Sequence, residues 1–466
     1  MLFDSPIFFI FLVAVVVAYW LLPLKRQNGF LLLASYFFYG WWDWRFLCLM
    51  AGSTAVDYVI ALRIARSDNE NRRRGLLIFS LVLNLSLLGI FKYFNFFVDS
   101  FAACLHALGV RDVPLPALRV LLPPGISFYT FQAIAYIVDV YQQKIEPSES
   151  LLDYALFISL FPHLIAGPIQ RPSHLLPQVQ TRRQFDSEKF FDGLMLIISG
   201  LFRKCVIADN CALIANAVFG GRFGPPNLLV VLLGTYAFAW QIYGDFSGYS
   251  DIARGAAQLL GFQFAINFRQ PYLATRLQEF WQRWHISLSS WIRDYVYMNM
   301  RFSYRNLVLT MLLCGLWHGA NWTYVFWGGL HGAIMAGERF MLRLRGIANR
   351  TSHSGLIKTW VQRILFFHLL CVTWIFFRAG SLSDGLSFLS GLAVLSWDPM
   401  YWTAFKFLAF FSVPLFLLDL ANEKAGTEYV FQNRPPLLRV AAGGFAWVVL
   451  ILFTANQAST FVYFQF

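Results

Sequence analysis

Long apolar stretches recur along this chain from end to end, and they constrain its fold more than any single motif does. They cover residues 5–24, 29–42, 46–62, 76–98, 125–142, 190–219, 227–263, 403–421 and 440–456. These runs are too long and too apolar for barrel strands, and in lipid the backbone polar groups need partners within the segment, so they predict transmembrane helices. Because one crossing needs about 20 residues, we expect an all-α polytopic transmembrane helical bundle of roughly ten to twelve spans.

Composition agrees with a membrane protein and indicates one domain. Hydrophobic residues make up 58% of the chain and charged residues only 13%. The net charge of +12 suits lysine- and arginine-rich cytoplasmic loops better than a nucleic-acid partner. The weakly hydrophobic stretches 99–121, 170–189 and 264–305 are each shorter than about 45 residues, which is below the usual size of a soluble domain. We therefore expect a single integral-membrane domain over residues 1–466.

The distribution of arginine predicts the topology. Arginines at residues 63–74 mark a cytoplasmic loop, which places the N-terminus outside. No basic segment precedes the first apolar stretch, and residues 20–26 lack a small-residue cleavage site, so we expect it to remain as an uncleaved first span. Segments 269–305 and 338–363 are also arginine-rich, and both are expected to be cytoplasmic.

The apolar stretch 306–337 between those two flanks has an unusual length. As one helix it would extend about 48 Å, whereas two full crossings need about 40 residues. We expect two short helices that meet at a break near Gly315 to Asn321 and place His318 well inside the bilayer. One long tilted helix is the alternative.

His318 is the first candidate functional residue. Glycines and an asparagine surround it in the run Gly315-Leu316-Trp317-His318-Gly319-Ala320-Asn321-Trp322. Ionisable groups at membrane depth are costly unless they face protein or a water-filled cavity, and they tend to mark sites of proton or substrate handling. The residues around it weaken the helix, so this backbone is expected to line a cavity.

Segment 264–305 is too polar to span the membrane, yet it is rich in aromatic residues. It predicts an amphipathic or re-entrant helix at the cytoplasmic interface, with Trp281, Trp284 and Trp291 towards the acyl boundary and arginines towards the headgroups. His285 would share a face of this helix with Trp281 and Ser289. Taken alone, His285 is more simply interpreted as a hydrogen-bonded structural histidine.

Two further polar clusters interrupt apolar runs. In residues 243–254, Asp251 and Arg254 are expected to form an ion pair, while Asp245 would orient an imidazole or bind a backbone turn opened by Gly244 and Gly248. Residues 161–172 contain too many prolines for a continuous helix. This segment is expected to be a broken, re-entrant element whose His163 either faces a ligand or caps a helix.

Several kinds of chemistry lack support in the sequence. His318 and His331 are thirteen residues apart, which on a helix separates them by about 20 Å, so we expect no metal site. Neither a serine nucleophile elbow nor a phosphate-binding loop occurs, and the six cysteines show no paired spacing. A histidine in a cavity without a protein nucleophile suits a general base that activates an incoming hydroxyl.

The chain resembles the bacterial membrane-bound O-acyltransferases, in the branch of the alginate O-acetyltransferase membrane component. The resemblance rests on blocks distributed over nearly the whole chain. They are Pro123–Gln132, Asp245–Asp251, Trp284–Ser289, Arg293–Tyr295, Gly315–Trp322, Trp327–Gly332 and Tyr463–Phe466. The D-alanyl transferase of teichoic acid modification shares many of them.

This resemblance implies that His318 is the catalytic histidine and His285 a second active-site histidine, on either side of a tunnel through thinned bilayer. The residues expected to support them are Trp284, Trp317, Asn321, Asp245, Ser247, Asp251 and Arg283. Asn321 or backbone amides at the break would polarise the carbonyl. The face formed by Arg269, Arg276 and Arg283 would hold donor phosphates, although contact with lipid headgroups explains it equally well.

The resemblance also implies a reaction and its partners. The enzyme would pass an acetyl group from cytoplasmic acetyl-CoA, without a permanently bound cofactor, to an extracytoplasmic polysaccharide such as alginate, cellulose or peptidoglycan. An SGNH-hydrolase-like partner would complete the transfer within a polysaccharide biosynthesis complex in the bacterial cytoplasmic (inner) membrane. The alternatives are a teichoic-acid-type D-alanyl transferase, a polysaccharide-precursor transporter and a scaffold for an extracytoplasmic enzyme.

Overall fold

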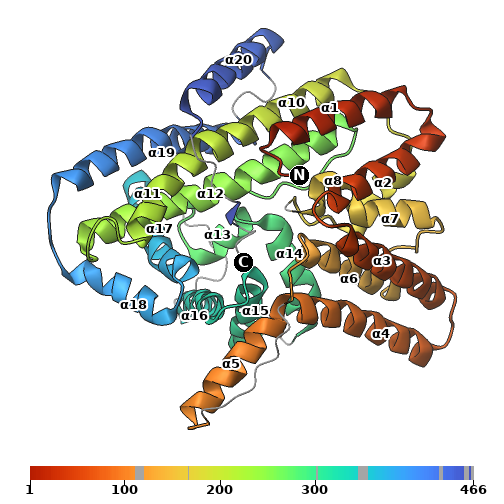
Figure 1. Ribbon diagram of the computed structural model, residues 1–466, viewed down its shortest axis with the longest axis horizontal. Helices are drawn as coiled ribbons and strands as arrows, with labels where there is room; N and C mark the ends of the chain where they lie inside the picture. The colour runs from red at the N-terminus through yellow and green to blue at the C-terminus, as the bar shows by residue number, and fades with distance from the viewer. Residues whose placement is uncertain are drawn as a thin grey trace. The chain divides into compact units, whose positions relative to one another are not determined.

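A computed structural model describes residues 1–110, 120–165, 167–300, 303–344, 355–429, 434–455 and 461–462 (Figure 1). Every regular element in these ranges is a helix. The all-α class is therefore confirmed. The chain forms two compact units, one of residues 1–194 with 253–265 and the other of residues 195–252 with 266–466. The terminal block Tyr463–Phe466 lies outside the described residues.

The first unit contains the N-terminal helices. They are α1 Pro6–Leu21, α2 Leu24–Gly40, α3 Trp44–Ala65, α4 Glu70–Leu88, the π-helical turn η1 Gly89–Tyr93, α5 Phe94–Ala107, α6 Ile126–Tyr141, α7 Leu151–Ser159, α8 Phe161–Leu164, α9 Pro172–Gln180 and the first half of α10 Ser187–Leu201. Helices α3, α4 and α6 pack on one another. The expected break in residues 161–172 is confirmed, since α8 has only one turn.

The second unit contains His285 and His318. Its elements are the π-helical segment η2 Phe202–Ala208, α11 Asp209–Phe219, most of α12 Leu228–Leu259, η3 Pro271–Leu273, α13 Leu277–Arg283, α14 Ile286–Tyr295, η4 Tyr297–Asn299, α15 Tyr304–His318, α16 Trp322–Leu344, α17 Leu356–Arg378, α18 Leu382–Ser390, η5 Gly391–Ala393, α19 Pro399–Ala425 and α20 Pro436–Phe453.

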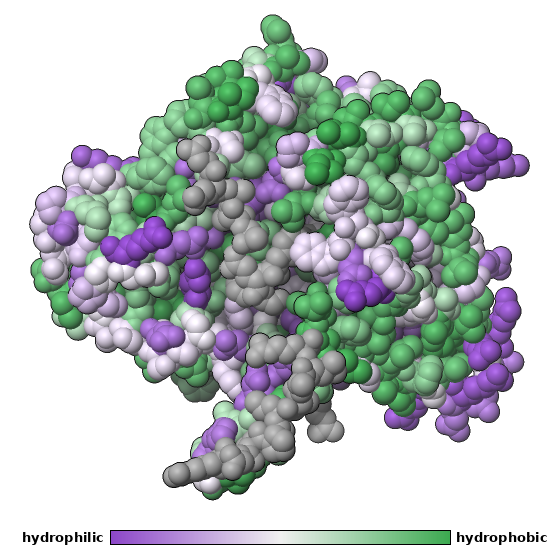
Figure 2. All heavy atoms as spheres, in the orientation of Figure 1, coloured by the Kyte–Doolittle hydropathy of each residue, from purple (hydrophilic) through white to green (hydrophobic). Residues whose placement is uncertain are grey.

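The chain is a multi-pass membrane protein. Among the described residues, six helical stretches are long and apolar enough to cross a membrane: Trp44–Ala65, Glu70–Ala107, Leu228–Leu259, Leu356–Arg378, Pro399–Ala425 and Pro436–Phe453. Other predicted windows form helices that are shorter or interrupted, such as Pro6–Leu21. Helix α20 carries strongly exposed Leu437, Phe445 and Ile451, and apolar side chains cover much of the visible surface (Figure 2). Such surface suits lipid rather than water.

Residues 304–344 form a helical hairpin. Helix α15 ends at His318, and α16 begins at Trp322. A Cβ atom added at Gly315 would lie 2.1 Å from the carbonyl oxygen of Tyr324, and one at Gly328 would lie 2.2 Å from that of Met311. These contacts require antiparallel helices whose backbones approach closely at small residues. The predicted break is confirmed, and the alternative of one long tilted helix is wrong.

The glycine contacts give a matched pair of variants. We expect Gly328→Ala to lower the free energy of unfolding by about 1–3 kcal/mol, because the new methyl group overlaps backbone that cannot withdraw alone. Gly337→Ala, on the same helix with nothing within 4 Å, should leave stability unchanged or raise it by up to about 1 kcal/mol. Thermal unfolding of both variants in detergent provides the measurement. Equal stability of the two would contradict the close packing.

Candidate active site

His318 lies at the end of α15, at the break in the hairpin. Its side chain is only 2% exposed. The imidazole is surrounded by aromatic rings, with ring centroids 5.1 Å from Trp317, 5.3 Å from Trp327 and 5.6 Å from Phe377. Because α16 and α17 provide two of these rings, the hairpin and its neighbour together enclose the histidine. His318 is therefore buried among protein side chains, while its position well inside the bilayer stays a prediction.

His285 occupies the junction between α13 and α14 and faces His318. Its backbone is in the left-handed region, with φ 42° and ψ 53°, which costs a residue other than glycine about 1–3 kcal/mol. The ring centroids of His285 and His318 lie 6.4 Å apart, and their planes make an angle of 61°. The structure therefore brings together the two histidines that the sequence motifs singled out.

The expectation that one helix carries His285 on the same face as Trp281 and Ser289 is wrong. The chain turns at Trp284 and His285, so His285 does not share one helix face with Trp281 and Ser289. The tryptophans also point into protein, with Trp281 7% and Trp284 0% exposed. Trp284 stacks on Phe280 at 5.4 Å and lies 5.3 Å from Trp374. These aromatic side chains build the wall of the site instead of anchoring the segment in lipid.

Asn267, which the sequence did not single out, holds His285 in place. Its side-chain oxygen Oδ1 lies 3.1 Å from Nδ1 of His285 and accepts from the backbone N–H of Ser287 at 3.2 Å and from its hydroxyl at 2.9 Å. Asn267 is 1% exposed. The rings of Phe246 and His285 also meet edge-on, with their centroids 4.5 Å apart. The imidazole of His285 is thus fixed by a hydrogen-bonding partner and an aromatic neighbour.

A buried charge cluster holds α12 at Asp245, the residue before Phe246. Lys204 Nζ lies 2.9 Å from Asp209 and 2.8 Å from Asp245, and the second oxygen of Asp245 accepts from the backbone N–H of Val462 at 2.6 Å. Asp245 therefore binds a lysine and a distant backbone group, which corrects the expectation that it orients an imidazole or closes a local turn. The importance of Lys204 was missed, because only the fold brings it to Asp245.

The neighbouring residues of α12 pack closely, and the helix is not interrupted there. A Cβ atom at Gly248 would lie 2.7 Å from the carbonyl oxygen of Gly200, so this glycine allows helix contact inside a continuous α12. The turn expected there is wrong. Ser247 is buried, and Asp251 lies 3.6 Å from Arg203. The ion pair of Asp251 with Arg254 stays a prediction.

Asn321 and Arg283 have structural partners. The side chain of Asn321 caps α16 by accepting from the N–H of Thr323 at 3.0 Å, and it donates to the carbonyl of Gly380 at 3.2 Å. Arg283 forms ion pairs with Glu423 at 2.7 Å and Glu279 at 2.9 Å. These carboxylates offset the charge that would attract donor phosphates, so Arg283 is better placed to hold α13 than to bind an anion.

Two other histidines have structural partners of their own. Nε2 of His331 lies 2.9 Å from the hydroxyl of Thr373, and its ring packs on Trp327 at 4.4 Å. His163, in the first unit, lies 3.1 Å from the amide oxygen of Gln132. Both side chains are buried.

Within the described residues, no group of three or more histidine, cysteine or acidic side chains is arranged to hold a metal ion.

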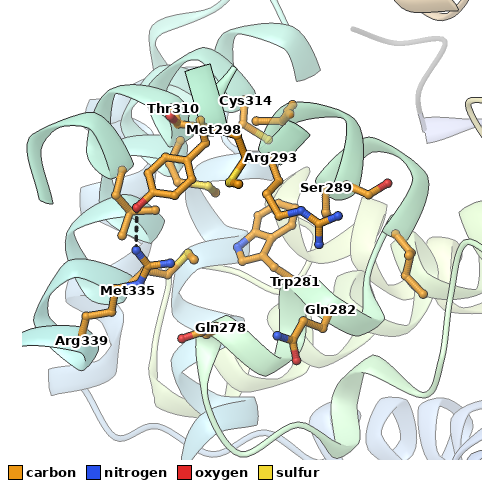
Figure 3. A pocket seen from close by; sticks show the side chains of 16 residues that line it. Gln278, Trp281, Gln282, Ser289, Arg293, Met298, Thr310, Cys314, Met335 and Arg339 are labelled. Carbon is orange, nitrogen blue, oxygen red and sulfur yellow. Dashed lines mark hydrogen bonds between the residues drawn. The ribbon is translucent and has the colours of Figure 1, made fainter. Parts of the chain in front are cut away.

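A cavity of about 310 Å³ lies between α13, α14, α15 and α16 (Figure 3). Its lining includes Trp281, Ile286 and Cys314. Ile286 follows His285 directly, and Cys314 lies one turn before His318, so the cavity reaches the segments that carry both histidines. Arg293 and Arg339 also line it, and Arg339 donates to the hydroxyl of Tyr297 at 2.8 Å. The cavity thus combines apolar walls with two cationic side chains at its edge.

Fold and site together define a multi-pass, all-helical membrane protein with two buried histidines facing each other. Residues 143–378 match the family model of MBOAT, the membrane-bound O-acyltransferase family. The chain is 42% identical over 392 residues to an Azotobacter vinelandii protein named "Probable alginate O-acetylase", covering 82% of this chain and 76% of that protein. The chain therefore belongs to the membrane-bound O-acyltransferase family and is an acyltransferase.

Two more relatives show the range of reactions named in this family. The peptidoglycan O-acetyltransferase of Helicobacter pylori is 35% identical over 435 residues, covering 85% of this chain and 80% of that protein. The teichoic acid D-alanyltransferase of Streptococcus thermophilus is 29% identical over 287 residues, covering 56% of this chain and 68% of that protein. The resemblance inferred from the sequence blocks is confirmed.

The charge cluster generates a stability prediction. We expect Lys204→Met to lower the free energy of unfolding by about 3–5 kcal/mol, because it leaves two carboxylates buried without their cation. Combining it with Asp245→Asn should recover part of the loss. Lys189→Met, which breaks a half-exposed pair with Asp186, should change stability by less than about 1 kcal/mol. Thermal unfolding in detergent would refute the prediction if Lys204→Met and Lys189→Met behaved alike.

Proposed function

We propose that the protein is a membrane O-acetyltransferase that passes an acetyl group from cytoplasmic acetyl-CoA across the membrane for O-acetylation of an extracytoplasmic polysaccharide. The observation that carries this proposal is the pair of buried imidazoles 6.4 Å apart at a helix break. The names of the alginate- and peptidoglycan-modifying relatives support the acetyl group and the polymer acceptor. A shorter match to a D-alanyltransferase keeps D-alanine as the second candidate acyl group.

In the proposed reaction, His318 is the general base. The acceptor hydroxyl gives its proton to His318 while its oxygen attacks the thioester carbonyl, and a new C–O bond replaces the C–S bond. The imidazolium then returns the proton to the departing thiolate. His285 positions the thioester or shares the proton, and backbone amides at the break polarise the carbonyl. Asn321, already engaged as a helix cap, would act by holding that break in shape.

The remaining candidate residues have supporting roles in the proposal. Trp317 and Trp284 exclude water from the histidines through the aromatic packing described above. Asp245, Ser247 and Asp251 would support the part of α12 that carries Phe246. Arg283 would fix α13 through its carboxylate partners.

The donor is proposed to enter through the cavity between α13 and α16. Its apolar walls suit the extended arm of acetyl-CoA, while Arg293 and Arg339 suit the phosphates. The face of Arg269, Arg276 and Arg283 stays the alternative anion site, although Arg283 is paired with Glu279 and Glu423 and Arg293 with Asp294. No permanently bound cofactor is required.

The proposal includes a cellular setting. The protein would lie in the bacterial cytoplasmic (inner) membrane with its N-terminus outside, in contact with membrane lipids. An extracytoplasmic partner resembling SGNH hydrolases would complete transfer to the polysaccharide within a biosynthesis complex. The arginine-rich segments on either side of the hairpin support a cytoplasmic entrance for the donor.

Replacing the histidines tests the chemistry. We expect His318→Ala to reduce acetyl transfer by at least about 100-fold while membrane accumulation stays normal, because the attacking hydroxyl loses its base. His368→Ala, at an exposed position of α17, is the matched control and should retain activity. The measurement is thiol release from labelled acetyl-CoA by purified protein with a candidate acceptor. Retained transfer in His318→Ala would rule out the proposed base, and movement of acceptor without thiol release would indicate a transporter.

The hairpin predicts that its two outer ends lie on one side of the membrane. In a chain with its native cysteines replaced, we expect Ser303→Cys and Arg343→Cys to react with an impermeant thiol reagent from the cytoplasmic side only. Labelling of intact and of permeabilised cells gives the readout. Reaction of the two positions from opposite sides would contradict the hairpin, and reaction of both from outside would reverse the proposed orientation.

A further inference from the structure

We infer that Asn267 is a positioning residue of the site, because it holds the proton of His285 on Nδ1 and leaves Nε2 with the lone pair through which His285 can share the reaction proton. This inference rests on the proposed function for its catalytic meaning. Its structural part concerns only the hydrogen bonds of Asn267, His285, Ser287 and Ser250.

The orientation of the Asn267 amide follows from its other partners. The backbone N–H of Ser287 lies 3.2 Å from the side-chain atom that also meets His285, and a backbone N–H only donates. That atom must therefore be the oxygen. The amide nitrogen of Asn267, on the opposite side, donates to the hydroxyl oxygen of Ser250 at 3.0 Å. A flipped amide would set two donors against each other at Ser287.

The protonation of His285 follows from that orientation. An amide oxygen only accepts, so the ring nitrogen 3.1 Å from it must carry a hydrogen. In the neutral imidazole, one nitrogen carries the hydrogen and the other carries a lone pair. With Nδ1 protonated, Nε2 has the lone pair. His285 is thereby set to accept a proton or a hydrogen bond, and not to donate one.

The same segment fixes the backbone around His285. The N–H of Ile286 donates to the carbonyl of Asn267 at 2.9 Å, and the N–H of Arg269 donates to the carbonyl of Arg283 at 2.9 Å. These two bonds flank His285, whose backbone is left-handed. Residues 267–269 thus determine both the direction of the side chain and its tautomer. Asn267 acts through His285, which makes it a positioning residue.

Two substitutions of Asn267 separate positioning from bulk packing. Asn267→Leu keeps similar volume but removes the acceptor, and we expect turnover to fall roughly 10- to 100-fold, the cost typical of losing the group that orients a functional histidine, with KM for acetyl-CoA unchanged. Asn267→Asp restores an acceptor for Nδ1–H and should recover much of that loss. Its carboxylate also stabilises the charged imidazolium, so the acid side of the pH–rate profile should move to higher pH.

A spectroscopic measurement tests the tautomer without relying on activity. In detergent-solubilised protein labelled with ¹⁵N-histidine, the His285 signals are assigned by their absence from His285→Ala. We expect the wild type to show a protonated Nδ1 and a lone-pair Nε2, and Asn267→Leu to lose that preference. A wild-type Nε2 that carries the hydrogen would overturn the inference.

The remaining results of these experiments also test the inference about Asn267. Unchanged turnover and an unchanged ¹⁵N spectrum in Asn267→Leu would refute the inference. If Asn267→Leu fails to fold, the pH–rate profile of Asn267→Asp decides, and a wild-type profile in that variant counts against positioning. If the wild-type protein transfers no acyl group, the proposed function fails, while the spectrum still tests the role of Asn267.

Discussion

The interrupted backbone between α15 and α16 is the constraint on which the rest of the structure depends. Helix ends carry unsatisfied N–H and carbonyl groups, and lipid offers them no partners. Here the side chain of Asn321 accepts from Thr323 and donates to Gly380, and the glycines of the hairpin let the backbones of α15 and α16 approach closely. A histidine can therefore end a helix inside an apolar environment and still be held by protein.

A buried cluster of charged residues in the second unit helps to fix the surroundings of His285. Lys204 joins η2 to α11 and α12, and Asp245 joins α12 to the backbone of Val462. The residue after Asp245 is Phe246, whose ring meets His285 at 4.5 Å. Buried ion pairs contribute little net stability when they are complete, but they fix positions, because breaking one partner is costly. The cluster thus sets the location of an aromatic contact to the site.

The sequence predicted the elements of this protein better than their contacts. Apolar length located the helices, and the length of residues 306–337 located the break, because both depend on distances along one segment. The proximity of His285 to His318 could be predicted only from the resemblance to the family. Asn267 and Lys204 were missed, since each acts through a side chain that only the fold brings next to it, His285 and Asp245 respectively. The tryptophans of residues 281–291 were misplaced because an amphipathic pattern does not distinguish lipid from a protein wall.

The two histidines rest on supports of different physical kinds. His318 is fixed by glycine contacts between backbones, which have no charge and are insensitive to ions. His285 follows α13, whose last residue is tied to Glu279 and Glu423 by ion pairs that are only partly buried. Such pairs weaken with salt, whereas close packing does not. Salt therefore weakens the ion pairs at the end of α13 more than it weakens the glycine contacts between α15 and α16.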